Sequence, residues 1–304
     1  LAIDPDINTF PTYSIAGGAD AAKFQIDAAT GALSFKAAPN FEVRSDVGAN
    51  NVYDVVVLAS DGQLGDLQTI SVVVTDVNEA PVIRSNGALP TASISVAENT
   101  TAVTTVTATD PDAGTTLAYS ISGGADAALF QIDAATGALS FKTAPNFEAP
   151  ADAGANNVYD VIVQASDGSL VDTQAIAVTV TDIDEPPVIT SDGGGATATL
   201  SVFENVTAVT TVQAAHPDAA AKLTYAITGG ADMFAFTIDA ETGALSFVYA
   251  PNFDAPTDVS SDNVYDVTVQ ASDGSLFSIS QAISVTVDDV TDETLFGTSH
   301  ADTL

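Results

Sequence analysis

Carboxylates are the residues of this chain whose type and number point most directly to a chemistry. The chain has 40 acidic and 6 basic residues, 2 histidines and no cysteine among its 304 residues. Hard divalent cations are bound by carboxylate and carbonyl oxygens, whereas disulfides, thiolate metal sites and thiol nucleophiles need the cysteines that are absent. The composition therefore indicates cation binding, and the positions of the carboxylates in the sequence indicate where the cations would bind.

The net charge excludes several kinds of partner. At a formal charge of −34 the chain is repelled by nucleic acid and by anionic membrane surfaces, so we expect neither as a partner. A hydrophobic content of 46% separates it from disordered acidic chains and allows a buried core. No apolar run approaches the ~18 residues of a membrane span, and the first residues do not form a signal peptide. We therefore expect no membrane insertion.

Motifs of the common enzyme classes are missing from the sequence. There is no HExxH motif, no phosphate loop and no histidine that recurs near a serine and an aspartate. Paired carboxylates serve glycosidases, but here the acids recur in every copy of a repeat and not in a single cleft. The sequence predicts that the chain is not an enzyme.

The sequence contains three copies of one segment. GGADAAKFQIDAATGALSF, which begins at Gly17, returns with one substitution at Gly123 and with several at Gly229, at a spacing of 106 residues. A period of this length corresponds to a whole domain. We expect the copies to span residues 1–81 (without the N-terminal strand), 82–186 and 187–291, followed by a tail over residues 292–304.

Each copy is a series of short strands separated by turns. The runs of the second copy, rich in β-branched and aromatic residues, are ASISVA, AVTTVTAT, TLAYSIS, LFQID, ALSFK, NVYDVIVQAS and TQAIAVTVTD. Clusters of Gly, Pro, Asp and Asn separate them. Seven strands in about 105 residues predict an all-β fold of tandem immunoglobulin-like Greek-key β-sandwiches.

Strands that alternate in direction place every second turn at the same end of a sandwich. With a short linker, the acids at the lower end of one copy then face the acids at the upper end of the next. At the first junction we expect Glu42, Asp76, Asn78, Glu79, Asp110, Asp112 and Asp167. At the second junction we expect Glu98, Glu148, Asp182, Asp184, Glu185, Asp218 and Asp273, with Asp126 at the same end as Glu98.

Carboxylates that converge on a small gap repel one another unless a cation lies between them. Ca²⁺ takes 6–8 oxygen ligands at roughly 2.3–2.6 Å, whereas Mg²⁺ demands a stricter octahedron and zinc prefers His or Cys. The sequence therefore predicts Ca²⁺ at both junctions. For single acids a structural role competes: Asp133 would cap a hairpin turn, and Asp160 would be solvated.

Five motifs, in order, resemble cadherin repeats, most closely the bacterial cadherin-like repeats of large secreted surface proteins. They are FQIDAATGAL from Phe130, AEN from Ala97, DPD from Asp110, ASD from Ala165 and the linker TDVNEAP from Thr75. The resemblance covers about residues 1–290. It implies calcium between successive domains, with Glu98, Glu148 and the linker acids as ligands from one domain and Asp110, Asp112 and Asp167 from the next.

The sequence departs from the animal cadherin pattern at several positions. Asn40, Asn146 and Asn252 replace the first acid of one turn, the linker is one residue shorter, and His216 replaces an aspartate in the third copy. A neutral imidazole is a poor ligand for a hard cation, so the second junction would bind fewer ions or bind them more weakly. Alternatively, His216 is a substituted surface residue and water completes the shell.

The tail GTSHADTL resembles the entry to the nonapeptide calcium repeats of type I-secreted (RTX-type) bacterial proteins, although the glycine pairs are missing. A simple linker is the alternative. Together with the absence of cysteine, the resemblance implies an extracellular or bacterial cell-surface location after type I secretion. The acids at the free ends (Asp4, Asp6, Asp61, Glu204, Asp254 and Asp288) are expected to bind ions weakly, because each group lacks its opposing ligands.

Two functions follow from these observations. In the first, calcium rigidifies the chain into a monomeric rod that spaces or mediates cell adhesion in a bacterial adhesin or biofilm protein. In the second, the repeats bind an extracellular polysaccharide or a cell surface, and the candidate aromatic residues are Phe10, Tyr13, Phe277 and Phe296. Tyr53, Tyr159 and Tyr265 are expected in the core. A third function, accessory domains of a secreted enzyme, has the least support.

Overall fold

A computed structural model describes residues 10–290 of the chain. The described residues form β-strands and three short 3₁₀ helices, without an α-helix. None of their helices has the length and apolar character needed to cross a membrane. The chain divides into two units, residues 1–181 and residues 182–304. The tail (292–304), Asp4 and Asp6, which the sequence analysis singled out, lie outside the described residues.

Two repeats make up the first unit. The strands of the first repeat are β1 (Thr12–Gly17), β2 (Phe24–Ile26), β3 (Leu33–Phe35), β4 (Val52–Ser60) and β5 (Gly65–Val73), with the 3₁₀ helix η1 (Ala21–Lys23). The strands of the second repeat are β6 (Val82–Ile83), β7 (Thr91–Ala97), β8 (Ala102–Thr105), β9 (Ala108–Thr109), β10 (Ala118–Gly123), β11 (Phe130–Ile132), β12 (Ala138–Phe141), β13 (Val158–Ser166) and β14 (Val171–Thr181), with the 3₁₀ helix η2 (Ala127–Leu129).

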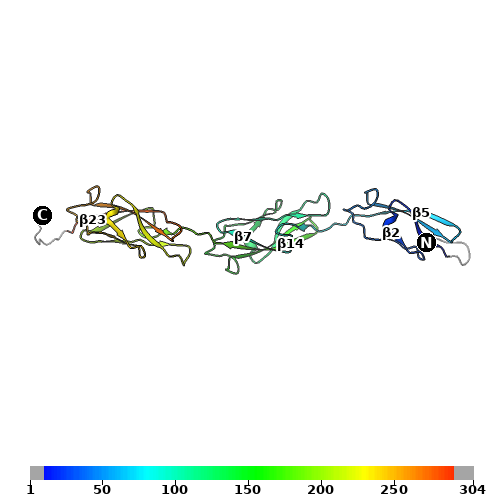
Figure 1. The fold of residues 1–304 in the computed structure, drawn as a ribbon, viewed down its shortest axis with the longest axis horizontal. Helices are drawn as coiled ribbons and strands as arrows, with labels where there is room; N and C mark the ends of the chain where they lie inside the picture. The colour runs from blue at the N-terminus through cyan, green and yellow to red at the C-terminus, as the bar shows by residue number, and fades with distance from the viewer. Residues whose placement is uncertain (1–9, 291–304) are drawn as a thin grey trace. The chain divides into compact units, whose positions relative to one another are not determined.

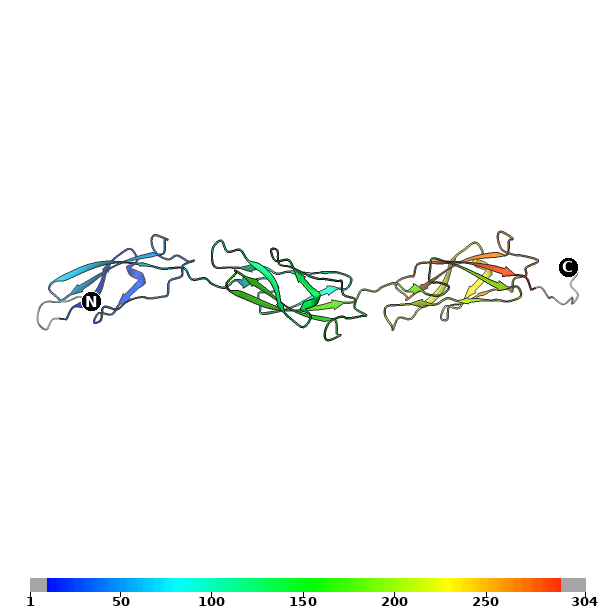
Figure 2. The ribbon, with the colours of Figure 1, turned by 180° about the vertical axis from the view of Figure 1, so that it is seen from behind.

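The second unit repeats this pattern. Its strands are β15 (Val188–Ile189), β16 (Thr197–Phe203), β17 (Ala208–Thr211), β18 (Ala214–Ala215), β19 (Thr224–Gly229), β20 (Phe236–Ile238), β21 (Ala244–Phe247), β22 (Val264–Ser272) and β23 (Gln281–Asp288), with η3 (Met233–Ala235). Strand β23 is labelled in Figure 1, and Figure 2 shows the same strand from behind in orange-red.

The second repeat is a sandwich of two sheets. One sheet has the order β10-β13-β14-β7, and the other has the order β11-β12-β8. Side chains alternate between core and solvent along the long strands, because successive residues of a strand point to opposite faces. In β13, for example, Tyr159, Val161, Val163 and Ala165 are buried while the intervening side chains are not. The second unit has the same sheets, β16-β23-β22-β19 and β17-β21-β20. The all-β sandwich expected from the sequence is therefore present.

Strand direction follows the predicted alternation. Strands β14 and β7 lie side by side and pair in parallel, from Ala175 with Thr91 to Thr181 with Ala97 (Figure 1). Seven strands that alternate in direction bring the first and the last into parallel alignment, so this pairing supports the placement of alternate turns at common ends. It puts the turn after β9 and the β13–β14 hairpin at one end of the second repeat.

One predicted strand of the second copy is divided in two. The run AVTTVTAT forms β8, which pairs with β12, and β9, which pairs with β6. Between them the buried Val106 donates its N–H to Gly137 O at 2.8 Å. Gly137 has a φ of +72°, and a Cβ there would lie 2.1 Å from Val106 O, so this crossing requires glycine. The sequence analysis missed β6 because a run of two strand residues carries no periodic signal.

Candidate metal-binding sites

Four carboxylates converge within the first unit and are called the first acidic cluster: Glu42, Asp76, Glu79 and Asp112. One oxygen from each lies within 4.8 Å of the others. Glu42 comes from the loop between β3 and β4, Asp76 and Glu79 from the segment between β5 and β6, and Asp112 from the turn between β9 and β10. The cluster thus collects side chains from both repeats of the unit, and all four are residues expected at the first junction.

Backbone and side-chain hydrogen bonds hold these segments together. Glu79 N donates to Asp112 Oδ2 at 3.1 Å, and Asp112 N donates to Asp110 Oδ1 at 2.9 Å. Nearby, Asn78 Nδ2 donates to Asp167 Oδ2 at 2.7 Å. The structure therefore brings together all seven residues that the sequence placed at the first junction, four in the cluster and three in contact with it or with one another.

Carboxylate oxygens at this place are buried without a hydrogen-bond donor. Among the described residues, no partner is found for Glu42 Oε1, Glu79 Oε2, Asp110 Oδ2 or Asp112 Oδ1. Burial raises the pKa of Glu79, and the negative charges of Glu42, Asp112 and Asp76 raise it further. A carboxylate can only accept hydrogen bonds, so buried oxygens without donors call for a cation. An all-oxygen donor set fits Ca²⁺.

Asp167 is fixed by its own turn. Its Oδ1 accepts the N–H groups of Ser169 at 2.6 Å and Leu170 at 2.7 Å. The backbone N–H groups of Leu170 and Ser169 and the amide of Asn78 hold the pKa of Asp167 below its ordinary value. The side chain is therefore ionised and positioned before any ion binds. Asp61 and Asp273 make the same turn in the first and third repeats.

Glu98 and Glu148 lie in the first unit, and Asp182 and Glu185 lie in the second. Glu98 follows β7 and is fully buried at 0% exposure. Its Oε2 accepts the N–H of Phe147 at 2.9 Å, which places the carboxylate against the loop that carries Glu148. The expected approach of this pair to Asp182 and Glu185 stays a prediction.

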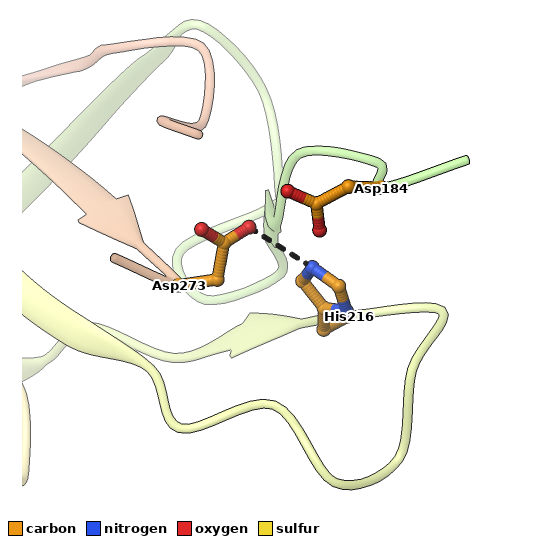
Figure 3. Close-up of side chains that lie close together, drawn as sticks. All are labelled: Asp184, His216 and Asp273. Carbon is orange, nitrogen blue, oxygen red and sulfur yellow. Dashed lines mark hydrogen bonds and ion pairs between the residues drawn. The ribbon is translucent and has the colours of Figure 1, made fainter. Parts of the chain in front are cut away.

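Asp184, His216 and Asp273 form a second group within residues 182–290, called the histidine cluster (Figure 3). One ligand atom of each lies within 4.8 Å of the others. His216 Nε2 lies 3.2 Å from Asp273 Oδ2, and His216 Nδ1 accepts the N–H of Asp218 at 3.0 Å. Burial lowers the pKa of His216, but the hydrogen bonds to the Asp273 carboxylate and to the Glu185 backbone and the charges of Asp218 and Asp273 raise it above its ordinary value overall. A neutral ring with hydrogen on Nε2 satisfies the contacts with Asp273 and with the Asp218 N–H.

A third group of acids follows the end of the third repeat. Burial, a hydrogen bond with Glu204 and the charges of Glu204 and Asp254 raise the pKa of Asp289. The sequence analysis placed Asp288 here, but Asp288 is the last residue of β23 and accepts the Glu204 N–H with its carbonyl. The segment from Ser275 to Gln281 is one residue longer than its counterpart in the second repeat, which shifts the following acid by one position.

Several recurrent acids serve the fold and not a metal site. Asp126 is buried and accepts the N–H groups of Ala153 at 2.7 Å and Asp160 at 2.8 Å, so its carboxylate holds two backbone segments together. Asp152, which the sequence analysis overlooked, accepts the N–H groups of Asn156 and Asn157, both at 3.0 Å. Both acids recur at the same position in all three copies, and that recurrence was the available signal.

Two structural expectations are confirmed. Asp133 caps its hairpin by accepting the N–H groups of Thr136 at 2.8 Å and Ala135 at 3.0 Å. Tyr159 is in the core at 1% exposure and packs edge-on against Phe141 with ring centroids 5.1 Å apart. The substituted Asn146 accepts the N–H of Ala149 and so stabilises its loop.

Comparison with known families agrees with this architecture. Residues 92–187 match the family described as Cadherin domain. Most of the second repeat is therefore similar to a cadherin domain. The chain is also 34% identical to human Protocadherin Fat 1 over 312 residues, covering 96% of this chain and 6% of that protein. It is 31% identical to human Protocadherin-15 over 255 residues, covering 80% of this chain and 12% of that protein. The chain therefore spans only a small part of these cadherin-related proteins.

Solved cadherin structures share the fold. The chain matches mouse Cadherin-23 EC22-24 with a TM-score of 0.51 and 23% identity, covering 95% of this chain and 90% of that one. It matches human CDH23 EC21-23 with a TM-score of 0.57 and 18% identity, covering 92% and 89%. The fold is that of tandem cadherin-like domains. The matching proteins are named as cadherins and protocadherins and not as enzymes, which agrees with the expectation of a non-catalytic chain.

Proposed function

We propose that the chain is an extracellular adhesion segment whose cadherin-like repeats bind Ca²⁺ at their junctions. The observation that carries this proposal is the first acidic cluster, with its buried carboxylate oxygens that have no donor among the described residues. Glu42, Asp76, Glu79 and Asp112 would hold the ion, with Asp110, Asn78 and Asp167 at its edge. Bound calcium supplies the positive charge that these mutually repelling oxygens require.

The residues expected at the second junction complete the proposal. Glu98 and Glu148 would act together with Asp182 and Glu185, while Asp184, Asp218 and Asp273 lie around His216. The proposed consequence is mechanical: ions at the junctions neutralise facing acids and hold successive repeats in a fixed relation, so that the chain spaces two surfaces as a monomeric rod. Ligand linkage adds about 2.7 kcal/mol of stability per site at a hundredfold excess over the dissociation constant.

Calorimetric titration of the chelator-treated chain with Ca²⁺ tests the proposal. The Asp112→Asn variant removes one ligand charge from the first acidic cluster, and we expect it to weaken one class of sites or abolish it. Asp160→Asn removes an equal charge from an exposed residue of β13 and serves as the matched control. A calcium titration that is the same in Asp112→Asn and wild type contradicts the assignment.

We also propose that the parent protein is a type I-secreted bacterial adhesin or biofilm protein. The support is the absence of cysteine and the resemblance of the tail to a nonapeptide calcium repeat, although the tail lies outside the described residues. The relatives reported above are animal proteins, so this proposal rests on the sequence. Fractionation of the source cells tests it, because recovery of the protein from the cytosol would contradict secretion.

Polysaccharide binding is the second candidate function, and one observation favours it. In the third repeat Phe234 and Tyr249 are exposed at 88% and 85%. Val248 N donates to Ala235 O at 2.8 Å, which brings their two backbone segments together. Of the aromatic residues named from the sequence, Phe10 and Phe277 are exposed, and Phe296 lies outside the described residues. A glycan array that gives the same signal for wild type and the Phe234→Ala, Tyr249→Ala double variant would exclude this surface.

A further inference from the structure

The histidine cluster differs in chemistry from the first acidic cluster. His216 occupies the position that Asp110 holds in the second repeat, and Asp273 and Asp184 correspond to Asp167 and Asn78. The donor set at this place is therefore one imidazole nitrogen and two carboxylates. Imidazole nitrogen suits zinc and other first-row transition metals, whereas calcium selects oxygen.

The geometry gathers these donors before any metal binds. The side chains of His216 and Asp273 are only 3% and 6% exposed, so both are held by their surroundings. Asp184 approaches from the segment before β15, and Figure 3 shows the three side chains converging from three different parts of the unit. Zinc sites use His nitrogen and carboxylate oxygen at about 2.0–2.2 Å, so ligands of one ion lie at most about 4.4 Å apart. The donor atoms here lie within 4.8 Å of one another, so a side-chain shift of a few tenths of an ångström would bring all three onto one ion.

Asp218 can orient the ring in the metal-bound state. Without a metal, Nδ1 accepts the Asp218 N–H and the hydrogen of the neutral ring is on Nε2. Coordination through Nε2 moves that hydrogen to Nδ1, which then faces the Asp218 N–H as a second donor, so the ring must turn away from that N–H and Nδ1–H needs an acceptor. Asp218 Oδ2 lies 3.9 Å from Nδ1, and a small rotation of the side chain brings it within hydrogen-bond distance. A carboxylate that accepts from the second nitrogen of a ligating histidine is the usual support of such a ligand.

Space for the remaining coordination positions is present. A surface hollow of about 510 Å³ is lined by the cluster together with Asp218, Ala219, Ala220, Ala221 and Ser275. The alanines carry no long side chains that would fill it. Water can therefore complete the coordination of an ion held by three protein ligands.

We propose that the histidine cluster is a zinc site, with His216 Nε2 and one carboxylate oxygen each from Asp184 and Asp273 as ligands and Asp218 as the acceptor for Nδ1–H. The proposal does not depend on calcium at the first acidic cluster, because it uses other residues and another class of ion. The third cadherin-like repeat would then respond to zinc where the second responds to calcium.

Titration of the full chelator-treated chain with Zn²⁺ in excess Ca²⁺, and with Co²⁺ followed by its visible absorption, tests the proposal. We expect one tight zinc site per chain and a cobalt spectrum typical of mixed nitrogen and oxygen ligands. His216→Asp restores the residue found at position 110 and is expected to lose both signals. Asp218→Asn is expected to weaken zinc binding about tenfold, as is common for a residue that supports a ligand. His300→Ala removes the other histidine and is expected to change neither signal.

Further variants keep the outcome decisive. His216→Gln retains a neutral polar side chain, so loss of zinc in both His216 variants with wild-type circular dichroism and thermal unfolding cannot be attributed to misfolding. Asp112→Asn is expected to leave zinc affinity unchanged, which separates failure of this proposal from failure of the calcium proposal. Zinc binding that persists in His216→Asp, or that is lost in His300→Ala, overturns the assignment.

Discussion

At one half-buried position beside a buried glutamine, the second repeat has an amide, Asn86, and the third has a carboxylate, Asp192. Asn86 Nδ2 donates to Gln174 Oε1 at 3.0 Å, and Asn86 Oδ1 accepts from Thr104. Asp192 takes the place of Asn86 and has no amide hydrogen to give, and the equivalent acceptor, Gln281 Oε1, is buried without a partner among the described residues. A buried acceptor without a donor costs about 1–3 kcal/mol.

Replacement of Asp192 by asparagine should therefore stabilise the third repeat. We expect Asp192→Asn to raise the free energy of unfolding by about 1 kcal/mol, because the new amide can donate to Gln281 Oε1. Urea denaturation measured in chelator checks this. The matched variant Asn86→Asp introduces the defect into the second repeat and should lower stability by a similar amount. Equal midpoints for Asp192→Asn and wild type would show that the oxygen has another donor.

At the scale of elements, the hairpin turns between β2 and β3, β11 and β12, and β20 and β21 share one cap. In the second repeat, the backbone N–H of Thr136, its hydroxyl group and the N–H of Ala135 hold the pKa of Asp133 below the ordinary 3.8. Asp27 and Asp239 are lowered by the same contacts. A lowered pKa in the folded state means that ionised Asp133 stabilises the turn at neutral pH.

The contribution of this cap should depend on pH with a definite sign. The folded pKa lies below the unfolded one, so the stabilisation is complete above the unfolded value and is lost as the pH falls through the folded value. We expect the difference in melting temperature between wild type and Asp133→Ala to be constant from about pH 5 to pH 8 and to shrink below about pH 4. Asp160→Ala is the control for loss of an exposed carboxylate. A difference that grows on acidification would contradict this origin.

The elements themselves were largely predictable from the sequence, because alternating patterns such as that of β13 report a strand with one buried face. The division of AVTTVTAT into β8 and β9 was not predictable, because the residue types are the same on both sides of the point where the strand passes from one sheet to another. The acids of the site were predicted from their recurrence in the three copies and from the resemblance to cadherin repeats. Recurrence alone could not separate Asp126, which accepts backbone hydrogens, from Asp112, whose Oδ1 has no donor among the described residues.

At the scale of the whole molecule, part of the charge of −34 lies where it needs compensation. The exposed turn carboxylates, such as Asp133, are satisfied by their own backbone. In the first acidic cluster, by contrast, Glu42, Glu79 and Asp112 each have one buried oxygen without a donor among the described residues, and the exposed Asp76 lies beside them. The repulsion there is local and weakly screened by salt, because buried charges are screened much less than exposed ones. Monovalent salt should therefore be a poor substitute for a divalent ion.

The proposed rigidity of the chain can be measured by small-angle X-ray scattering. With Ca²⁺ we expect a larger maximum dimension and a narrower distribution of conformations than in chelator, because an ion that takes ligands from two successive repeats would limit bending at the linker between them. Added sodium chloride at equal ionic strength is the control and should not reproduce the effect. Asp112→Asn should shift the calcium dependence to higher concentration, while Asp160→Asn should not. A maximum dimension that is the same with calcium and with chelator would exclude a mechanical role for the ion and leave it a purely local stabiliser of each junction.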